Sequence, residues 1–348
     1  MKLLTSLVSV SGLSGYEADV NQLIEGEWKS LVDEISFSKV GSVQALKYGK
    51  GKSPRSSVMV AAHLDAIGLM VSQVTDGFLR MTTIGGIDPK ILPGTPVLVH
   101  GRKLLPGVIV QVPAHLMTND QITKSLNFES LLVDTGLLAG EVNRLVEVGD
   151  LISFNTKPTD LGGGYFSGHS LDNRVSVAAL TEFLRELQQN SHAWDVWALA
   201  SVQEELNFLG AATSTFSLEP DLAIILDVTF GKGPGSEGWQ TFEMGKAPTI
   251  GLGSDIHPVL HDKFVQLAEK LNFPCEIEPM PASSGTEAMA VQVSRSGIPT
   301  MVIGIPIRYM HTPVEMVSMK DIHMAARLVT EFVRSLDEEV MAQLVWPD

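Results

Sequence analysis

The sequence predicts an α/β protein: a mostly parallel sheet sandwiched by helices, with an inserted small β-barrel or PDZ-like domain. Two observations support this fold class. From residue 171 onward strand-like and helix-like segments alternate, which favours a parallel sheet covered on both faces. Between residues 69 and 155, short β-like runs are separated by Gly and Pro. The chain is therefore expected to form a discontinuous α/β domain, residues 1–68 and 156–348, and an inserted β-rich domain, residues 69–155.

The first segment is expected to supply two helices and three strands. Leu3, Leu4 and Leu7 fall at helical spacing with polar residues between them, which favours an amphipathic helix over a signal peptide. A second helix is expected over residues 16–32. Two short strands, 34–38 and 42–47, precede SSVMVAAHLD at 56–65, an apolar run that ends in polar residues, as buried parallel strands do.

The inserted block contains short β-like runs that predict a small barrel or sandwich. They read GFLRMTTIGG, TPVLVHG, GVIVQVP, SLLVDTG and DLISF. The glycine-rich stretch TDLGGGYFSG, residues 159–168, is predicted to be a linker that returns the chain to the α/β domain.

The last part of the chain carries the alternating segments. Expected helices lie at 175–189, 207–216, 264–271, 286–293 and 319–336, and expected strands at 196–202, 222–228 and 299–304.

Composition narrows the class of protein. A formal net charge of −15 argues against a nucleic-acid binder, which needs clustered Lys and Arg to meet phosphates. No stretch approaches the roughly 18 uninterrupted apolar residues of a membrane span. The single cysteine, Cys275, excludes an internal disulfide and a cysteine-rich metal site, and fits a reducing compartment. These features favour a cytoplasmic protein that does not bind nucleic acid or membranes.

Polar residues follow the apolar strands at the point where each strand ends. Taken singly, each has an ordinary explanation: a carboxylate before a helix can be an N-cap, and a lone histidine is commonly structural. Ligand sites in open α/β sheets lie at the carboxyl ends of the strands, so together these residues predict one site. They are His63 and Asp65, Asp172, Glu204 and Glu205, Asp227, and His311.

The donor types in this set indicate a metal centre. Imidazoles and carboxylates without a thiol suit divalent zinc, cobalt or manganese. One catalytic zinc takes three protein ligands, whereas five candidate ligands remain here after two residues are set aside for orientation and acid–base chemistry. That number suffices for two metals sharing one carboxylate, about 3.5–4 Å apart.

The two residues set aside are expected to have separate roles. Residues i and i+2 of a strand share a face, so Asp65 is expected to orient the His63 ring. Glu204 and Glu205 can serve one site only if the chain turns after the strand. One of them would then bind metal, and the other would act as general base toward a water held between two metals.

These residues resemble a known family in combination. AAHLDAIGLMV, LDNR, SVQEELNFLGA, ILDVT and RYMHTPVEMV, in that order, resemble the glutamyl and deblocking aminopeptidases of the dinuclear-metal peptidase clan. Some members form tetrahedral (TET) dodecamers, and others have been labelled cellulase or endoglucanase M. The resemblance covers essentially the whole chain, including the β-rich block.

The resemblance implies a zinc-peptidase fold of phosphorylase/hydrolase type, with the inserted domain used in subunit contacts. It implies a homo-oligomer, from a dimer to a dodecamer, that removes N-terminal residues from peptides. By matching position, His63 and Asp227 would hold one metal, Glu205 and His311 the other, and Asp172 both. Glu204 would be the general base, and Asp65 would orient His63.

Three positions depart from the family pattern. Ala66 and Lys232 each stand where an acidic residue is expected, and Glu287 stands where an aspartate is expected. They leave the substrate preference open. The alternatives are a related metallo-carboxypeptidase or amidohydrolase, a glycoside hydrolase that uses Glu204 with a second carboxylate, and a non-catalytic assembly protein. An aromatic content of 6% is low for a sugar-stacking cleft.

Overall fold

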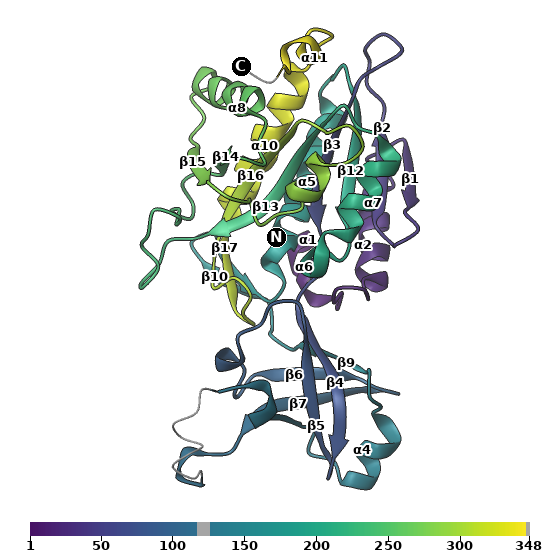
Figure 1. Ribbon diagram of the computed structural model, residues 1–348, viewed down its shortest axis with the longest axis vertical. Coiled ribbons are helices and arrows are strands. Elements are labelled where there is room, and N and C mark those ends of the chain that lie inside the picture. The colour runs from purple at the N-terminus through teal and green to yellow at the C-terminus, as the bar shows by residue number, and fades with distance from the viewer. Residues whose placement is uncertain (117–125, 346–348) are drawn as a thin grey trace.

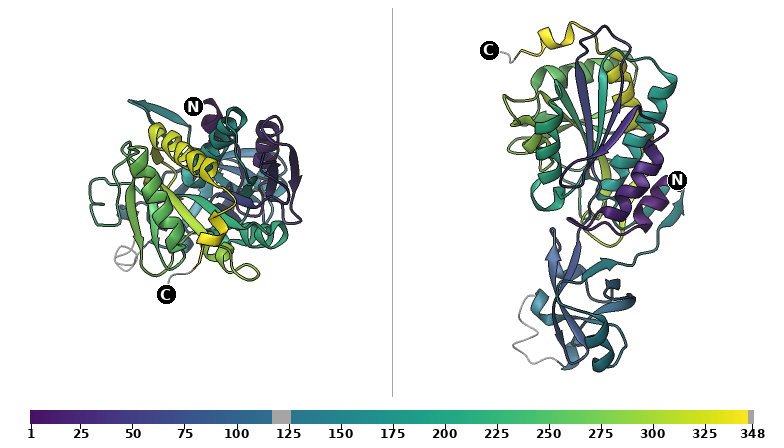
Figure 2. Two further views of the ribbon diagram at one scale, coloured as in Figure 1. Left: turned by 90° about the horizontal axis from the view of Figure 1, so that it is seen from above. Right: turned by 90° about the vertical axis from the view of Figure 1, so that its right-hand side faces the viewer.

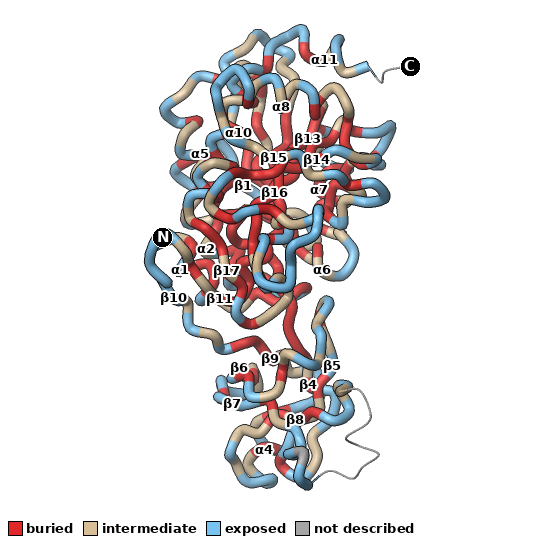
Figure 3. Tube along the Cα trace, turned by 90° about the vertical axis from the view of Figure 1, so that its left-hand side faces the viewer, coloured by how far each residue is buried: buried red, intermediate tan, exposed pale blue. Residues whose placement is uncertain are grey.

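The computed structural model describes residues 1–116 and 126–345. Figure 1 shows two lobes joined by a narrow connection: an α/β body above and a β-barrel below. The view turned by 90° on the right of Figure 2 shows the same separation. Buried residues form two groups, one along the strands of the large sheet and one inside the barrel (Figure 3). The α/β architecture with an inserted barrel is therefore confirmed.

The large sheet has a parallel centre and antiparallel edges. Strands β12 (Asp195–Ser201), β3 (Ser57–His63), β13 (Leu222–Phe230) and β16 (Thr300–Arg308) are neighbours in that order, and all run parallel. Apolar, β-branched runs make these strands, and nearly every residue in them is buried because helices cover both faces.

The remaining strands of this sheet extend its two edges. On one side β2 pairs antiparallel with β12, and β1 pairs with β2; on the other side β17, β11 and β10 follow β16, while β14 pairs with β16 and with β15. Their bounds are β1 Glu34–Phe37, β2 Val43–Lys47, β10 Thr159–Gly162, β11 Tyr165–Gly168, β14 Thr249–Gly253, β15 Glu276–Met280 and β17 Glu315–Ser318.

Helices pack on both faces of the sheet. α5 contacts β3 and β13 and also packs against α1, α2 and α10, so these helices form one layer, which α8 extends beside α10. α7 contacts β12, and α9 contacts α7 and β16, on the other face. The bounds are α1 Lys2–Ser9, α2 Ala18–Trp28, α5 Leu171–Gln189, α6 Glu204–Asn207, α7 Leu209–Leu218, α8 Pro258–Lys270, α9 Ala288–Gln292, α10 Met319–Ser335 and α11 Val340–Gln343.

The barrel closes in the strand order β4-β5-β8-β7-β6-β9 and encloses its own apolar cluster. Its strands are β4 Gly68–Thr75, β5 Phe78–Ile84, β6 Pro96–His100, β7 Leu104–Gln111, β8 Leu131–Asp134 and β9 Leu151–Phe154. Among its described residues the barrel domain also contains helix α4 and three 3₁₀ turns: Ala139–Leu145, Pro89–Ile91, Ala114–Leu116 and Phe128–Ser130.

One local prediction was wrong. The glycine-rich stretch predicted as a linker is the β10–β11 hairpin, because Gly162, Gly163 and Gly164 adopt positive φ and allow a tight turn, and β11 then pairs with β17. The helix expected over residues 207–216 is α7, shifted by two residues, and the short helix α6 precedes it, with Phe208 between them at a φ of 58°. Among the described residues no helix has both the length and the apolarity needed to cross a membrane.

Candidate metal centre

The side chains singled out in the sequence converge at the carboxyl ends of the parallel strands. His63 is the last residue of β3, Asp227 lies on the neighbouring β13, and β12 leads into α6. Asp172 lies at the start of α5, and His311 lies in the turn after β16. One pocket of about 390 Å³ is lined by six of the seven predicted residues: His63, Asp172, Glu204, Glu205, Asp227 and His311.

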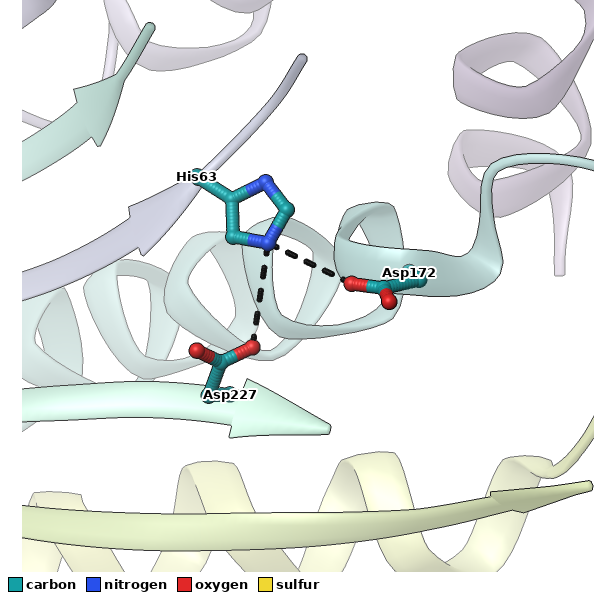
Figure 4. A group of neighbouring side chains, drawn as sticks. All are labelled: His63, Asp172 and Asp227. Atoms are coloured by element: carbon teal, nitrogen blue, oxygen red, sulfur yellow. Dashed lines mark ion pairs between the residues drawn. The ribbon is translucent and has the colours of Figure 1, made fainter. Parts of the chain in front are cut away.

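The first group of potential ligand atoms centres on His63. Its Nε2 lies 3.3 Å from Asp172 Oδ1 and 3.8 Å from Asp227 Oδ1. Figure 4 shows both carboxylates turned toward this nitrogen from different elements. Together the ligand atoms of His63, Asp172 and Asp227 lie close enough to one another to hold a metal ion.

A second group shares one residue with the first. His311 Nε2 lies 3.3 Å from Asp172 Oδ2 and 3.3 Å from Glu205 Oε2. Asp172, Glu205 and His311 form this second possible metal-binding group. The two oxygens of Asp172 therefore face two different sets of ligands, as a bridging carboxylate requires.

The backbone around Asp172 explains how its side chain reaches both groups. The first turn of α5 is irregular: Asp172 and Asn173 have non-helical dihedral angles, so the Asp172 carboxylate does not act as a helix cap. The Asn173 side chain donates a 3.0 Å hydrogen bond to the carbonyl of Leu226, next to Asp227. This bond holds the start of α5 against β13.

Glu315, which the sequence interpretation missed, connects both groups from below. Its buried carboxylate accepts hydrogen bonds from the backbone N–H of Asp172 at 3.1 Å and of His311 at 2.9 Å. It lies four residues after His311, within the stretch RYMHTPVEMV that carries part of the family resemblance. The Asp172 carboxylate raises the pKa of His311, and the backbone of Gly86, just after β5, adds to this rise through a hydrogen bond with the ring.

Asp65 has a wider role than orienting His63. β3 ends at His63, so Asp65 lies beyond the strand, and its Oδ1 lies 3.5 Å from His63 Nδ1. Its carboxylate also accepts the backbone N–H groups of Glu204 at 3.0 Å and Glu205 at 3.2 Å, and the hydroxyl of Ser14. Asp65 thus fixes the start of α6 that carries both glutamates.

Glu204 and Glu205 both line the pocket, because the chain turns between β12 and α6 as the sequence analysis required. Gln203 adopts a left-handed conformation with φ of 57°, and α6 begins at Glu204. Glu205 belongs to the second ligand group, whereas Glu204 belongs to neither, although its Oε2 lies 3.7 Å from His63 Nε2. Glu204 therefore lies beside the proposed ligands without belonging to either group.

The electrostatics of the pocket show an excess of buried negative charge. Burial and the neighbouring carboxylates raise the pKa of Glu204 to about 8, against the opposing effect of His63. Burial and Asp172 likewise raise the pKa of Glu205. Burial also raises the pKa of Asp227 well above its usual value. Buried like charges of this kind are stable only when cations or protons compensate them.

The three departures from the family pattern lie in different surroundings. Ala66 is buried and joins the backbones of Gly12 and Ser14. Lys232 is exposed two residues after the end of β13. Glu287 is buried behind the site, hydrogen-bonds to the Ser201 hydroxyl at 2.5 Å, and has its pKa raised to about 7 by burial.

Comparison with known proteins identifies the family. The M42 glutamyl aminopeptidase family matches residues 41–328. A lysyl aminopeptidase of Pyrococcus furiosus is 34% identical, over 96% of this chain and 97% of its own length. A TET aminopeptidase structure from a marine-sediment Thaumarchaeota archaeon superposes with a TM-score of 0.94 at 29% identity, covering 99% of this chain and 98% of that one.

A second solved structure concerns assembly. A TET1 peptidase of Pyrococcus horikoshii, which can form a tetrahedron or a large octahedral shell, matches with a TM-score of 0.84 at 27% identity, over 96% of this chain and 99% of its own. These matches favour an aminopeptidase over a carboxypeptidase, an amidohydrolase or a glycoside hydrolase. The chain belongs to the M42 family of metal-dependent aminopeptidases.

Proposed function

We propose that this aminopeptidase works with two divalent cations per subunit, zinc or cobalt in the first place and manganese as a third possibility. His63 and Asp227 would hold one cation, Glu205 and His311 would hold the other, and Asp172 would be shared by both. The observation that carries this proposal is the geometry of Asp172, whose two oxygens each lie 3.3 Å from a different histidine.

The chemistry of the donors supports these cations. Imidazole nitrogens and carboxylate oxygens without thiolates are the ligands that zinc, cobalt and manganese accept. Glu205 Oε1 is buried and has no hydrogen-bond partner among the described residues. A buried carboxylate oxygen left in this way is costly unless a cation is bound nearby.

The protein residues then perform the proton transfers of peptide hydrolysis. When bound, the cations polarise the scissile carbonyl and lower the pKa of the attacking water. Glu204 accepts the proton of that water at its carboxylate and delivers it to the nitrogen of the leaving amine. Asp65 keeps Glu204 in place through the backbone N–H that it accepts.

Two variants separate metal binding from proton transfer. Glu204→Gln should keep two metals per subunit, measured by elemental analysis of the purified protein, and lose about 10²–10⁴-fold in kcat on aminoacyl-nitroanilides. Asp172→Asn should lose metal as well as activity, because it removes a shared ligand. The exposed Glu338, which does not line this pocket, provides a matched control as Glu338→Gln.

Three results would contradict these roles. Unchanged hydrolysis by Glu204→Gln would show that another group is the general base. A wild-type protein with one metal per subunit, or an Asp172→Asn variant that keeps two, would contradict the shared-ligand arrangement. Restoring zinc, cobalt or manganese to chelated protein and measuring kcat with each identifies the working metal.

The organisation of the chain is part of the proposal. Residues 1–68 and 156–348 form the catalytic domain, and residues 69–155 form a domain for subunit contact. The barrel carries exposed apolar side chains, among them Leu104, Leu138 and Val148, which supports such a contact. A homo-oligomer, from a dimer to a TET-type dodecamer, is testable by sedimentation velocity. The single cysteine supports a cytoplasmic location.

A further inference from the structure

The pocket extends from the proposed metal ligands into a recess lined by residues of three strands of the large sheet, β13, β16 and β15. Side chains two residues apart on a strand share a face, so Thr229 lies on the same face of β13 as Asp227. By the same alternation, Val302 and Gly304 share a face of β16, and Glu278 and Met280 share a face of β15. All of these residues line the pocket, which places Glu278 in the same cavity as the donor groups.

Gly304 brings the carboxylate of Glu278 close to the centre. In the sheet, Gly304 is paired with Asp227 on one side and with Thr249 on the other. A β-carbon at position 304 would lie 2.2 Å from Thr249 Oγ1 and 2.9 Å from Glu278 Oε2, so the carboxylate occupies space that only glycine leaves open. The Glu278 carboxylate therefore lies over β16. This strand is the neighbour of β13, which carries Asp227, and neighbouring strands are about 4.8 Å apart.

The contacts of Glu278 leave its charge without a cationic partner. Thr229 Oγ1 donates to Oε1 at 2.6 Å and Thr249 Oγ1 donates to Oε2 at 2.5 Å. Within the described residues, no Lys, Arg or His forms an ion pair with it. Both donors are neutral hydroxyls, and an ionised carboxylate offers about four lone-pair sites, so Glu278 can accept further hydrogen bonds from a ligand.

We propose that Glu278 determines the substrate specificity of this site and selects peptides whose first residue is Lys or Arg. This inference rests on the proposed function, because the recess adjoins the residues that would hold the cations. The methylene groups of such a side chain lie along Met280 and Val302, and its charged end donates to Glu278.

Other first residues fit the recess less well. An acidic side chain would meet Glu278 as a like charge, which is unfavourable at short range in a partly buried pocket. An apolar side chain would displace water from the carboxylate without replacing its hydrogen bonds, which costs free energy. The predicted preference is therefore opposite to the acidic residue in the description of the M42 family.

The test compares four substrates on the full-length, metal-loaded enzyme. kcat/KM is measured for Lys-, Arg-, Leu- and Glu-p-nitroanilide with the wild type, Glu278→Gln and Glu276→Gln. Glu276 lies on the same strand but does not line the pocket, so its variant is a control for charge removal. The kcat/KM of the wild type should be at least about 10-fold higher for Lys or Arg than for Leu, and about 100-fold higher than for Glu, because a Glu substrate would place its carboxylate against that of Glu278.

In Glu278→Gln, the Lys-to-Leu ratio of kcat/KM should fall about 10–100-fold, with Leu hydrolysis rising. Glu276→Gln should keep the wild-type ratio. A wild type that prefers Leu or Glu, or a Glu278→Gln variant with an unchanged ratio, overturns the specificity proposal and leaves the peptidase function intact. A metal-loaded wild type that cleaves none of the four overturns the proposed function and this inference with it.

Discussion

Glu315 holds the backbones of both donor groups, so its substitution tests whether this support sets the affinity for metal. The residue is 1% exposed and accepts the N–H groups of Asp172 and His311, one on each oxygen. Glu315→Gln keeps the shape of the side chain but turns an NH2 group toward one of these N–H donors. One buried hydrogen bond to a charged acceptor is lost, which is worth about 1.5–3 kcal/mol.

The expected loss of metal affinity follows from this energy. If the loss falls on the metal-bound form, 1.4 kcal/mol per tenfold gives about 10–150-fold weaker binding, in agreement with the 10–100-fold that is typical of residues supporting metal ligands. The metal-free protein should lose less stability, because burial and the Asp172 charge already raise the pKa of Glu315 well above its usual value. Removing the charge relieves that repulsion.

The assay is competition for zinc between the metal-free protein and a chromophoric chelator, with thermal unfolding of the same samples. Glu338→Gln is the control for loss of an exposed carboxylate. Zinc affinity of Glu315→Gln within threefold of the wild type would refute the reasoning. So would an equal loss of stability in the metal-free and metal-bound forms, because that result would indicate a general packing defect.

Two further predictions concern stability. Arg174 is fully buried and donates hydrogen bonds to the backbone carbonyls of Leu7 and Leu64. Arg174→Met should therefore lower the free energy of unfolding, measured by urea titration, by about 3 kcal/mol. An unchanged urea midpoint would contradict this role. Burial raises the pKa of Asp321 from 3.8 to about 6, so the folded state binds more protons and stability falls as pH rises from about 4 through 6. Asp321→Asn should therefore gain stability relative to the wild type between pH 4 and pH 8, by on the order of 2 kcal/mol in chelated protein, and a difference independent of pH would contradict the assignment.

The sequence contained enough information for the centre of the fold and for the donor set. Long apolar strands such as β3 and β13 are buried on both faces, so their patterns are strong, and the polar residue at the end of each is conspicuous. His63 and Asp227 could be placed together because parallel strands end at one edge of a sheet. The barrel was recognisable because its turns recur at short intervals.

The residues that support the site gave weaker signals. Glu315 begins the four-residue strand β17 and Glu278 lies on the short edge strand β15, and in such short strands a carboxylate is usually interpreted as a solvent-facing residue. Their importance depends on tertiary contacts: Glu315 accepts N–H groups from separate segments, and Glu278 extends across Gly304. Neither contact follows a sequence period, so no local pattern predicts it. The hairpin of β10 and β11 was missed because glycine runs suit linkers and tight turns equally.

Backbone conformation explains why the exact positions of the ligands could not be derived from local preferences. Several non-glycine residues around the centre adopt positive φ, a region that costs on the order of 1 kcal/mol or more for each such residue. They stand within or directly next to the segments that carry proposed ligands: Ser170, Gln203, Phe208, Tyr309 and His311. Local propensity opposes each of these conformations, and the backbone N–H groups of Glu204 and His311 donate hydrogen bonds to the Asp65 and Glu315 carboxylates, which helps to fix these segments in place. These conformations lower the stability of the folded state at this edge of the sheet, where they hold carboxylates and imidazoles together. Such local strain is expected at a functional site.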